Sequence, residues 1–400
     1  MNALRRILAL FLIVLLLIAG CGRPETALPA APPADPPATR PQAPAAEAAT
    51  PAPAESPSAA PGSTEEPVSG LTPEEVATLN SLERVDGYPL YTMHYYGSYR
   101  RAGVAQGSLA DLGSSSRVEV RSSFPAPEPQ ETPGRAAPRG SSWACSLFAA
   151  LADPANRLYG RNFDWEFSPA LLLFSSPTDG YASVSMVDIA YMGFGGGNAT
   201  GVADLPLGKR QALLEAPSLP FDGMNDQGLA VGMAAVPPGD MQPDPGKETI
   251  GSLGVIREML DHARDVPEAV AILERHNIDM TGGPPVHYLV ADRSGRAALV
   301  EFYGGKMVVL PNEAPWHLAT NFLRAAAGAS PAGQCRRYDE LERQLARAQG
   351  QLTAAEAMDL LFTVSQPSTQ WSVVYALSTG QVDVVMGRQT GNRHTFTLER

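Results

Sequence analysis

Residues 143–146 read Trp-Ala-Cys-Ser and residues 160–165 read Gly-Arg-Asn-Phe-Asp-Trp, so Arg161 and Asp164 follow Cys145 by sixteen and nineteen residues. A cysteine becomes a nucleophile when a cation stabilises its thiolate and a base takes its proton. Each part alone has an ordinary explanation, because buried cysteines are commonly inert and an isolated Arg-Asn-x-Asp is commonly a turn. The chain contains no H-E-x-x-H, C-x-x-C or G-x-S-x-G sequence, which leaves Cys145 as the candidate nucleophile.

The sequence around Cys145 resembles the cysteine N-terminal-nucleophile hydrolases. These form the superfamily of linear amide C–N hydrolases, with choloylglycine hydrolases, acid ceramidases and penicillin acyltransferases of the peptidase C45 type. The resemblance begins with Cys145 and the Gly-Arg-Asn-x-Asp element at this spacing. It continues over most of residues 143–390 through Asp222-Gly223-Met224-Asn225-Asp226-Gln227-Gly228-Leu229, Ala319-Thr320-Asn321, Cys335-Arg336-Arg337-Tyr338 and Gln370-Trp371-Ser372-Val373-Val374-Tyr375.

The resemblance implies roles for Cys145, Arg161 and Asp164. Arg161 is expected to stabilise the Cys145 thiolate, and Asp164 to hold the free α-amino group of Cys145. That amino group, with an ordinary pKa of about 8, suits general-base work. It exists only after the bond between Ala144 and Cys145 is cut, and in the family the thiol itself makes this cut. We expect the same autoproteolysis here.

The resemblance also implies groups that bind the oxyanion formed when the thiol attacks an amide. Asn321 matches one donor. The bile-salt branch of the family has a second asparagine where this chain has Ala235, so a backbone N–H would have to serve and a bile-salt substrate is put in doubt. Asn225 is a weaker candidate, since a turn residue with a left-handed backbone explains it equally. Arg337 matches a family arginine, although Arg336 beside it leaves the register open by one.

Cys335 lies two residues before Arg337. If Cys21 is modified, Cys145 and Cys335 are the only remaining pair for a disulfide. An inert buried thiol and an inactivating disulfide with Cys145 are the two readings of Cys335. The six histidines stand at no metal-ligand spacing, so no metal or cofactor is expected.

The order of predicted elements is that of an α+β protein. Strands are expected at residues 88–99, 183–190, 228–235, 287–291, 297–303, 306–310, 316–320, 371–377, 382–386 and 394–398, and helices at 72–82, 252–263, 266–276, 337–348 and 354–364. Strands and helices do not alternate regularly, which favours antiparallel sheets covered by helices over a doubly wound parallel sheet. The resemblance implies the four-layer αββα sandwich of N-terminal-nucleophile hydrolases.

The first seventy residues are not part of the folded domain. Arg5 and Arg6 precede thirteen apolar residues, fewer than the roughly twenty that span a membrane, as in a signal peptide over residues 1–20. Ile18-Ala19-Gly20-Cys21 resembles a bacterial lipobox, which implies cleavage before Cys21 and its acylation; an uncleaved membrane anchor is the alternative. Residues 21–70 are rich in Pro and Ala and form a tether. The catalytic domain is expected at residues 71–400, with the processing site after Ala144.

The net charge of the chain and the resemblance limit the possible substrates and reactions. The formal net charge of −12 argues against a nucleic-acid partner and favours small or uncharged substrates. The resemblance implies that the substrate is a small-molecule N-acyl amide. We therefore expect an exported bacterial lipoprotein, anchored to the cell membrane and facing outward or into the periplasm, that hydrolyses linear amides through a cysteine thioester. An acyltransferase that uses an amine acceptor is the alternative within the family. A non-catalytic envelope-binding lipoprotein is the alternative outside it.

Overall fold

The computed structural model describes residues 70–99, 144–239, 241–328 and 330–399. These residues belong to one compact unit. The predicted signal peptide, Cys21, nearly all of the tether and residues 100–143 lie outside the described residues. Within the described ranges, no helix has the length and apolar character needed to cross a membrane.

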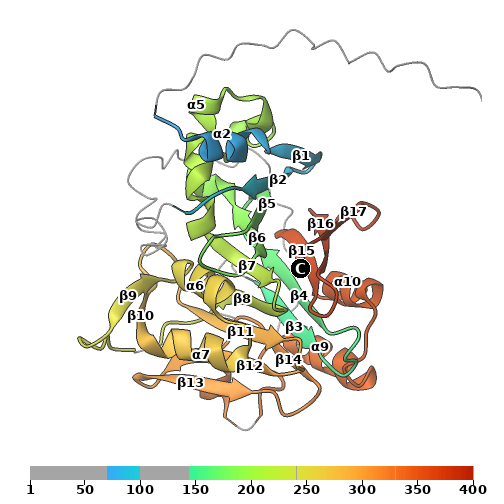
Figure 1. Cartoon of the computed structure of the whole chain (residues 1–400). Helices are drawn as coiled ribbons and strands as arrows, with labels where there is room; N and C mark the ends of the chain where they lie inside the picture. Colours follow the sequence, from blue (N-terminus) through green and yellow to red (C-terminus); the bar gives the residue numbers. More distant parts are fainter. Residues whose placement is uncertain (1–69, 100–143, 240, 329, 400) are drawn as a thin grey trace, which may run out of the picture. The chain divides into compact units, whose positions relative to one another are not determined.

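Two large sheets form the centre of this unit (Figure 1). The nine-stranded sheet has the order β1 (Glu83–Asp86), β2 (Leu90–Tyr95), β5 (Ala170–Ser175), β6 (Ser183–Asp188), β7 (Pro220–Asn225), β8 (Leu229–Ala235), β11 (Val286–Asp292), β12 (Ala297–Tyr303) and β13 (Lys306–Pro311). The six-stranded sheet has the order β14 (Trp316–Ala319), β3 (Ser146–Ala150), β4 (Leu158–Asp164), β15 (Thr369–Ala376), β16 (Gln381–Met386) and β17 (Arg393–Thr397). β9 (Glu248–Gly251) and β10 (His276–Asp279) form a separate pair.

Helices connect and cover the strands. The α-helices are α2 (Pro73–Asn80), α5 (Leu207–Arg210), α6 (Gly254–His262), α7 (Val266–Arg275), α8 (Arg324–Ala327), α9 (Arg336–Arg347) and α10 (Ala354–Thr363). Short 3₁₀ helices are η1 (Ile189–Met192), η2 (Gly196–Asn198), η3 (Val202–Asp204) and η4 (Gln211–Ser218). α2 and α10 each begin with a threonine and a glutamate in a capping box, which satisfies the first free backbone N–H groups.

The two sheets pack face to face between two helix layers. β3 contacts β8 and β11, and β14 contacts β12, across the interface between the sheets. α6 and α7 cover the other face of the nine-stranded sheet, while α9 and α10 cover the other face of the six-stranded sheet (Figure 1). This four-layer αββα arrangement confirms the predicted α+β fold class.

Close packing between the sheets places the central strands in a fully buried core. Every residue of β3, β4, β8, β11 and β15 is buried. At Gly232 on β8, an added Cβ would lie 2.8 Å from the Tyr159 hydroxyl of β4, so only glycine allows the sheets to approach this closely here. A second apolar cluster, including Phe148, Leu341 and Leu361, lies between the six-stranded sheet and its helices.

Strand direction is the main correction to the sequence prediction. β2 pairs with β5 and β9 pairs with β10 in parallel, whereas only antiparallel neighbours were expected. β3 and β4, which belong to the other sheet, lie between β2 and β5 in the chain, so the connection is long enough for a parallel pairing. The strand expected at residues 88–99 covers only Leu90–Tyr95, and β1 before it was not predicted.

Candidate active site

Cys145 lies directly before β3, in the hairpin that β3 forms with β4. Ser146 pairs with Asn162 and Leu147 with Arg161, so Cys145 is opposite Phe163. Directly opposite residues of an antiparallel pair project to the same face. The thiol therefore shares the face between the sheets with Arg161 and Phe163, and the Cys145 side of the hairpin is closed to solvent, with only 4 % of the residue exposed.

Arg161 is the cation nearest to the thiol. Its Nη2 lies 4.0 Å from Sγ of Cys145 and donates to the carbonyl oxygen of Met233 at 3.1 Å. Its Nη1 donates to Oδ2 of Asp222, and both side chains of this ion pair are fully buried. One edge of the guanidinium therefore faces the thiol while the other is neutralised by a carboxylate.

Asp222 of β7 is a site residue that the sequence interpretation did not assign. Its Oδ1 accepts from the Tyr375 hydroxyl at 2.5 Å and its Oδ2 accepts from Nε1 of Trp371 at 3.4 Å, in addition to Arg161. Tyr375 and Trp371 lie on β15, beside β4. The available signal was a charged residue inside the apolar strand Pro220–Asn225, since buried charges are nearly always paired.

Asp164 ends β4 and is also buried. Its Oδ1 accepts from Oγ1 of Thr369 at 2.5 Å, whereas its Oδ2 is buried without a hydrogen-bond partner in the described structure. Burial raises the pKa of Asp164 to about 6, against the lowering effects of Thr369, Arg337 and Arg161. An unpaired buried carboxylate oxygen costs free energy, so this oxygen is a ready acceptor for a nearby cation.

The electrostatic balance at Cys145 disfavours the thiolate in the uncut chain. Burial raises the pKa of the Cys145 thiol above its ordinary value, and the Arg161 charge only partly offsets this. The charge of Asp164 also raises the thiol pKa, whereas a hydrogen bond from the Asp164 backbone and the charge of Arg337 lower it. A nucleophilic thiol in this position therefore needs a further proton acceptor.

Asn321 and Arg337 meet on the backbone side of Cys145. Nη1 of Arg337 donates to the Cys145 carbonyl oxygen and to Oγ of Ser146 at 2.7 Å, and Nη2 donates to Oδ1 of Asn321 at 2.9 Å. Arg337, rather than Arg336, is the arginine that reaches the site. Nδ2 of Asn321 donates to the Ala235 carbonyl oxygen at 2.8 Å. A side-chain amide has two N–H groups, so this bond leaves the second one available.

Ala235 lies beside Asn321 at the end of β8. The Val236 amide donates to the Pro285 carbonyl oxygen at 2.8 Å, so Ala235, one residue earlier, is in the non-hydrogen-bonded position relative to β11. Its N–H and C=O therefore point away from β11, toward the side from which Asn321 approaches. β7 pairs with β8 only as far as Gly232, so this edge of β8 is not covered by β7.

Asn225 does not reach this site. Its Nδ2 donates to the carbonyl oxygens of Leu260 and Ala263 at the end of α6, and its Oδ1 accepts from the Leu229 amide. The left-handed backbone expected at Asn225 is also wrong, since Gly228 takes the positive φ, +77°, in this turn. Asn225 ties α6 to the turn and has no group free for a substrate.

Cys335 is a free thiol next to α9. Both Cys145 and Cys335 are reduced, and Cys335 precedes the helix without capping it through its side chain. It is half-buried, so the expectation of a fully buried thiol is corrected.

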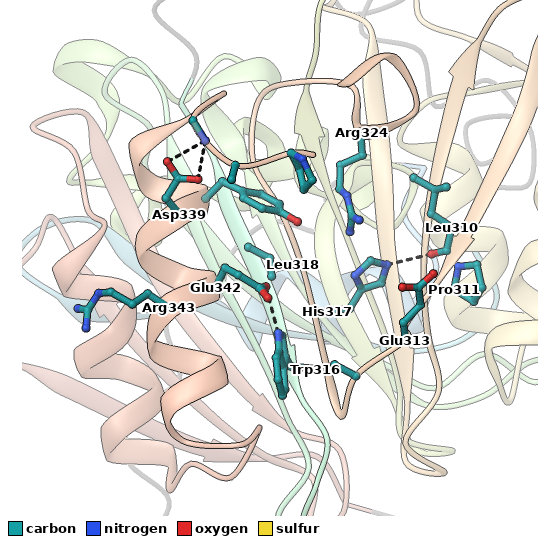
Figure 2. Close-up of a pocket in the computed structure, with 15 residues that line it drawn as sticks. Leu310, Pro311, Glu313, Trp316, His317, Leu318, Arg324, Asp339, Glu342 and Arg343 are labelled. Carbon is teal, nitrogen blue, oxygen red and sulfur yellow. Dashed lines mark hydrogen bonds between the residues drawn. The ribbon is translucent and has the colours of Figure 1, made fainter. Parts of the chain in front are cut away.

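Two pockets lie near these residues. A narrow one of about 30 Å³ opens at Cys145 and is lined mainly by apolar side chains: Phe163, Trp165, Phe221, Met233, Ala235, Pro284 and Val286, with Arg161 and Ser252. A larger one of about 600 Å³ lies between β13, β14 and α9 (Figure 2). His317 and Arg324 point into this larger pocket, which Cys145 does not line. Across the described ranges, no three His, Cys, Asp or Glu side chains gather as metal ligands.

The site therefore combines a buried thiol just before a strand, an ion-paired arginine beside it and an Asn–Arg pair at its backbone, within an αββα sandwich. Residues 145–322 match the family model of the linear amide C–N hydrolases, choloylglycine hydrolase family. The match begins at Cys145 itself. It supports the resemblance over residues 145–322, where the chain is similar to the linear amide C–N hydrolases.

Two solved structures illustrate what the chain is similar to. A mutant of the conjugated bile acid hydrolase from Clostridium perfringens is 16% identical with a TM-score of 0.47, and covers 64% of this chain and 92% of its own. Penicillin V acylase from Agrobacterium tumefaciens is 16% identical with a TM-score of 0.42, and covers 64% of this chain and 86% of its own. No curated protein is significantly similar in sequence.

Proposed function

We propose that Cys145 is the nucleophile of an amidase that transfers the acyl group of a linear amide first to its own sulfur and then to water. The observation that carries this proposal is the position of Arg161, whose Nη2 lies 4.0 Å from Sγ while Asp222 fixes its other edge. A guanidinium held in this way stabilises a thiolate without rotating toward solvent.

The proposed reaction has two halves. The thiol gives its proton to the α-amino group of a processed Cys145, and sulfur attacks the amide carbonyl carbon to form a tetrahedral intermediate. Its collapse breaks the C–N bond, the proton passes to the leaving amine, and a thioester remains on Cys145. Water, deprotonated by the same amino group, then cleaves the thioester to a carboxylic acid and the free thiol.

The base requires that the bond between Ala144 and Cys145 be cut, and Asp164 supports this step. Its buried Oδ2 has no partner in the described structure, and burial keeps its pKa at about 6. A new α-ammonium group at Cys145 would supply a cation to this oxygen. In the cut, the Cys145 sulfur attacks the Ala144 carbonyl carbon, the amide nitrogen leaves as the new amine, and water hydrolyses the thioester.

Two donors support the proposed oxyanion site. The second N–H of the Asn321 amide is available after its bond to the Ala235 carbonyl, and Arg337 fixes the orientation of that amide through Oδ1. The Ala235 N–H points to the same side of β8 as its carbonyl. A backbone donor at this position replaces the side chain that the bile-salt branch of the family has there.

The lining of the Cys145 pocket favours an uncharged acyl group. Phe163, Trp165 and Phe221 supply aromatic surface, and the one charged side chain in the lining, Arg161, is already paired with Asp222. A charged acyl group would lose its hydration without gaining a counter-charge. We therefore propose small-molecule N-acyl amides with an apolar acyl part.

The deciding experiment compares the full-length chain with its Cys145→Ser and Cys335→Ser variants by intact mass, then assays N-acyl amides with and without an added amine. Two fragments and turnover in the parent and in Cys335→Ser, with neither in Cys145→Ser, support the proposal. An acylated amine as the main product indicates an acyltransferase. Turnover that survives Cys145→Ser would exclude Cys145 as the nucleophile.

We further propose that Cys21 is acylated and anchors the chain to the cell membrane, on the strength of its lipobox-like sequence. Two or more acyl chains are needed for stable anchoring. Cys21→Ser should move the protein from the membrane fraction to the soluble fraction. Retention in the membrane fraction would favour an uncleaved apolar anchor at residues 7–19.

A further inference from the structure

Glu301 of β12 is a fully buried carboxylate that plays no part in the chemistry proposed above. Its Oε1 accepts from Nδ1 of His287 at 3.0 Å and from the backbone amide of Arg324 at 2.9 Å. Its Oε2 accepts from the backbone amide of Ala325 at 2.7 Å. In the part of the chain that the structure describes, no Lys or Arg side chain forms a salt bridge with it.

These contacts connect the two sheets. Glu301 belongs to the nine-stranded sheet, whereas Arg324 and Ala325 follow β14 of the six-stranded sheet. Only Phe322 and Leu323 separate Arg324 from Asn321. Glu301 therefore holds the backbone of the segment that carries Asn321.

His287, which donates to Glu301, lies next to β8. It lies on β11 opposite Ala234, the neighbour of Ala235, whose carbonyl accepts from the Asn321 amide. The Asn321 segment is thus fixed at its side chain by Ala235 and at its backbone by Glu301. The side chains of both Glu301 and His287 are fully buried.

The charge on Glu301 needs an explanation beyond packing. A buried carboxylate costs several kcal/mol unless hydrogen bonds compensate it, and an apolar side chain would fill the same space without that cost. Burial opposes its ionisation, but the hydrogen bond and charge of His287 and the two backbone amides outweigh it, so the pKa of Glu301 lies below its ordinary value. An ionised carboxylate only accepts, so Nδ1 of His287 carries the proton, and Nε2 is buried without a partner in the described structure.

We infer that Glu301, held by His287, is a positioning residue that fixes the Asn321 donor against β8 for the acyl-transfer steps. This inference rests on the proposed function, because it assigns the carboxylate a role in keeping the oxyanion donor in place. Arg324, whose backbone amide donates to Glu301, also lines the larger pocket together with His317 (Figure 2).

Two pairs of variants of the full-length chain test this role. Glu301→Gln keeps the shape of the side chain, but its single oxygen can accept a hydrogen bond from only one of the two backbone amides. His287→Phe removes the donor to Glu301, whereas His287→Asn keeps a donor where Nδ1 stands and should restore the parent behaviour. Asp383→Asn is the matched control, because Asp383 is a buried carboxylate that accepts from Gln381 and Thr395 far along the other sheet.

Three quantities are measured: kcat and KM on an N-acyl amide, the rate of Cys145 alkylation followed by peptide mass, and hydrogen exchange over residues 320–328. We expect Glu301→Gln and His287→Phe to lower kcat by about tenfold or more, since loss of an oxyanion donor costs about 10²–10³ in kcat. KM and Cys145 alkylation should stay within about threefold, because alkylation needs no oxyanion donor, and exchange over 320–328 should accelerate. Asp383→Asn should leave all three unchanged.

An unchanged exchange rate over residues 320–328 in Glu301→Gln overturns the inference, and so does a parallel loss of alkylation and turnover. If Glu301→Gln does not fold, His287→Phe against His287→Asn carries the same test. If the parent itself turns over no amide, the proposed function fails, and the exchange measurement still decides whether Glu301 positions the Asn321 segment.

Discussion

Asp222→Asn separates the structural role of the buried ion pair from its effect on the thiol. In the parent, Asp222 accepts from Arg161, Tyr375 and Trp371, all three buried. Asparagine keeps the shape but removes the counter-charge of Arg161. Removing one partner of a buried ion pair leaves the other charge uncompensated and costs about 3–5 kcal/mol. The free energy of unfolding should fall by about that amount.

The same change should make Cys145 more acidic. Nη2 of Arg161 lies 4.0 Å from Sγ, and without Asp222 the full positive charge acts on the thiolate. An opposite charge within 4–6 Å lowers a pKa by about 1–3 units, so the thiol pKa should fall while stability falls. A general loss of packing would not produce this combination.

Urea unfolding gives the free energy of unfolding, and the pH dependence of Cys145 alkylation gives the thiol pKa; both compare chains in the same processing state. Tyr375→Phe is the matched control, since it removes one hydrogen bond to the same carboxylate and keeps the ion pair. It should cost about 1.5–3 kcal/mol and leave the thiol pKa near that of the parent. An Asp222→Asn chain with unfolding free energy within about 1 kcal/mol of the parent, or with an unchanged thiol pKa, would refute this reasoning.

Three further changes test other contacts. Burial raises the Asp164 pKa from 3.8 to about 6, so the carboxyl ionises at lower pH in the unfolded chain than in the folded one. The uncut Cys145→Ser chain should therefore lose about 2 kcal/mol of stability between pH 4 and pH 7. Asp164→Asn should flatten that dependence in urea unfolding at the two pH values; an equal loss in both chains contradicts this. Arg337→Lys keeps the charge but loses the fork that holds Asn321, so kcat should fall about tenfold with little change in KM; parent kinetics would exclude the role. Gly228 has a φ of +77°, and a Cβ added there would lie 2.5 Å from a backbone oxygen. Gly228→Ala should therefore lower the free energy of unfolding by about 2–4 kcal/mol in thermal or urea unfolding. A smaller loss would mean that the turn relaxes.

The roles of Arg161 and Asp164 could be predicted from the resemblance and from the need of a nucleophilic thiol for a cation and a base. Their distance from Cys145 was not predicted, because neither β3 nor β4 was expected as a strand; the hairpin that these strands form sets it. Asn321 and Arg337 came from family resemblance alone, because nothing in their own segments indicates that they approach Cys145. The structure brings both to its backbone.

Asp222, Tyr375 and Glu301 could not be assigned from the sequence for a different reason. Asp222 meets Tyr375 across the two sheets, and Glu301 meets backbone amides of a segment in the opposite sheet. Such pairs depend on which strands face each other, and a hydrophobic pattern does not contain that information. For the same reason, the pattern did not reveal that β2 and β5 run parallel.

Several effects act together to disfavour the Cys145 thiolate in the uncut chain. Burial disfavours the thiolate, Asp222 takes part of the Arg161 charge, and Asp164 adds negative charge nearby. An amino group formed at Cys145 would change two of these effects at once, because it can accept the thiol proton and, when charged, can pair with the free oxygen of Asp164. Under the proposed function, the cut would therefore give a base for repeated turnover to a weakly ionised thiol that has to attack the adjoining Ala144 carbonyl only once.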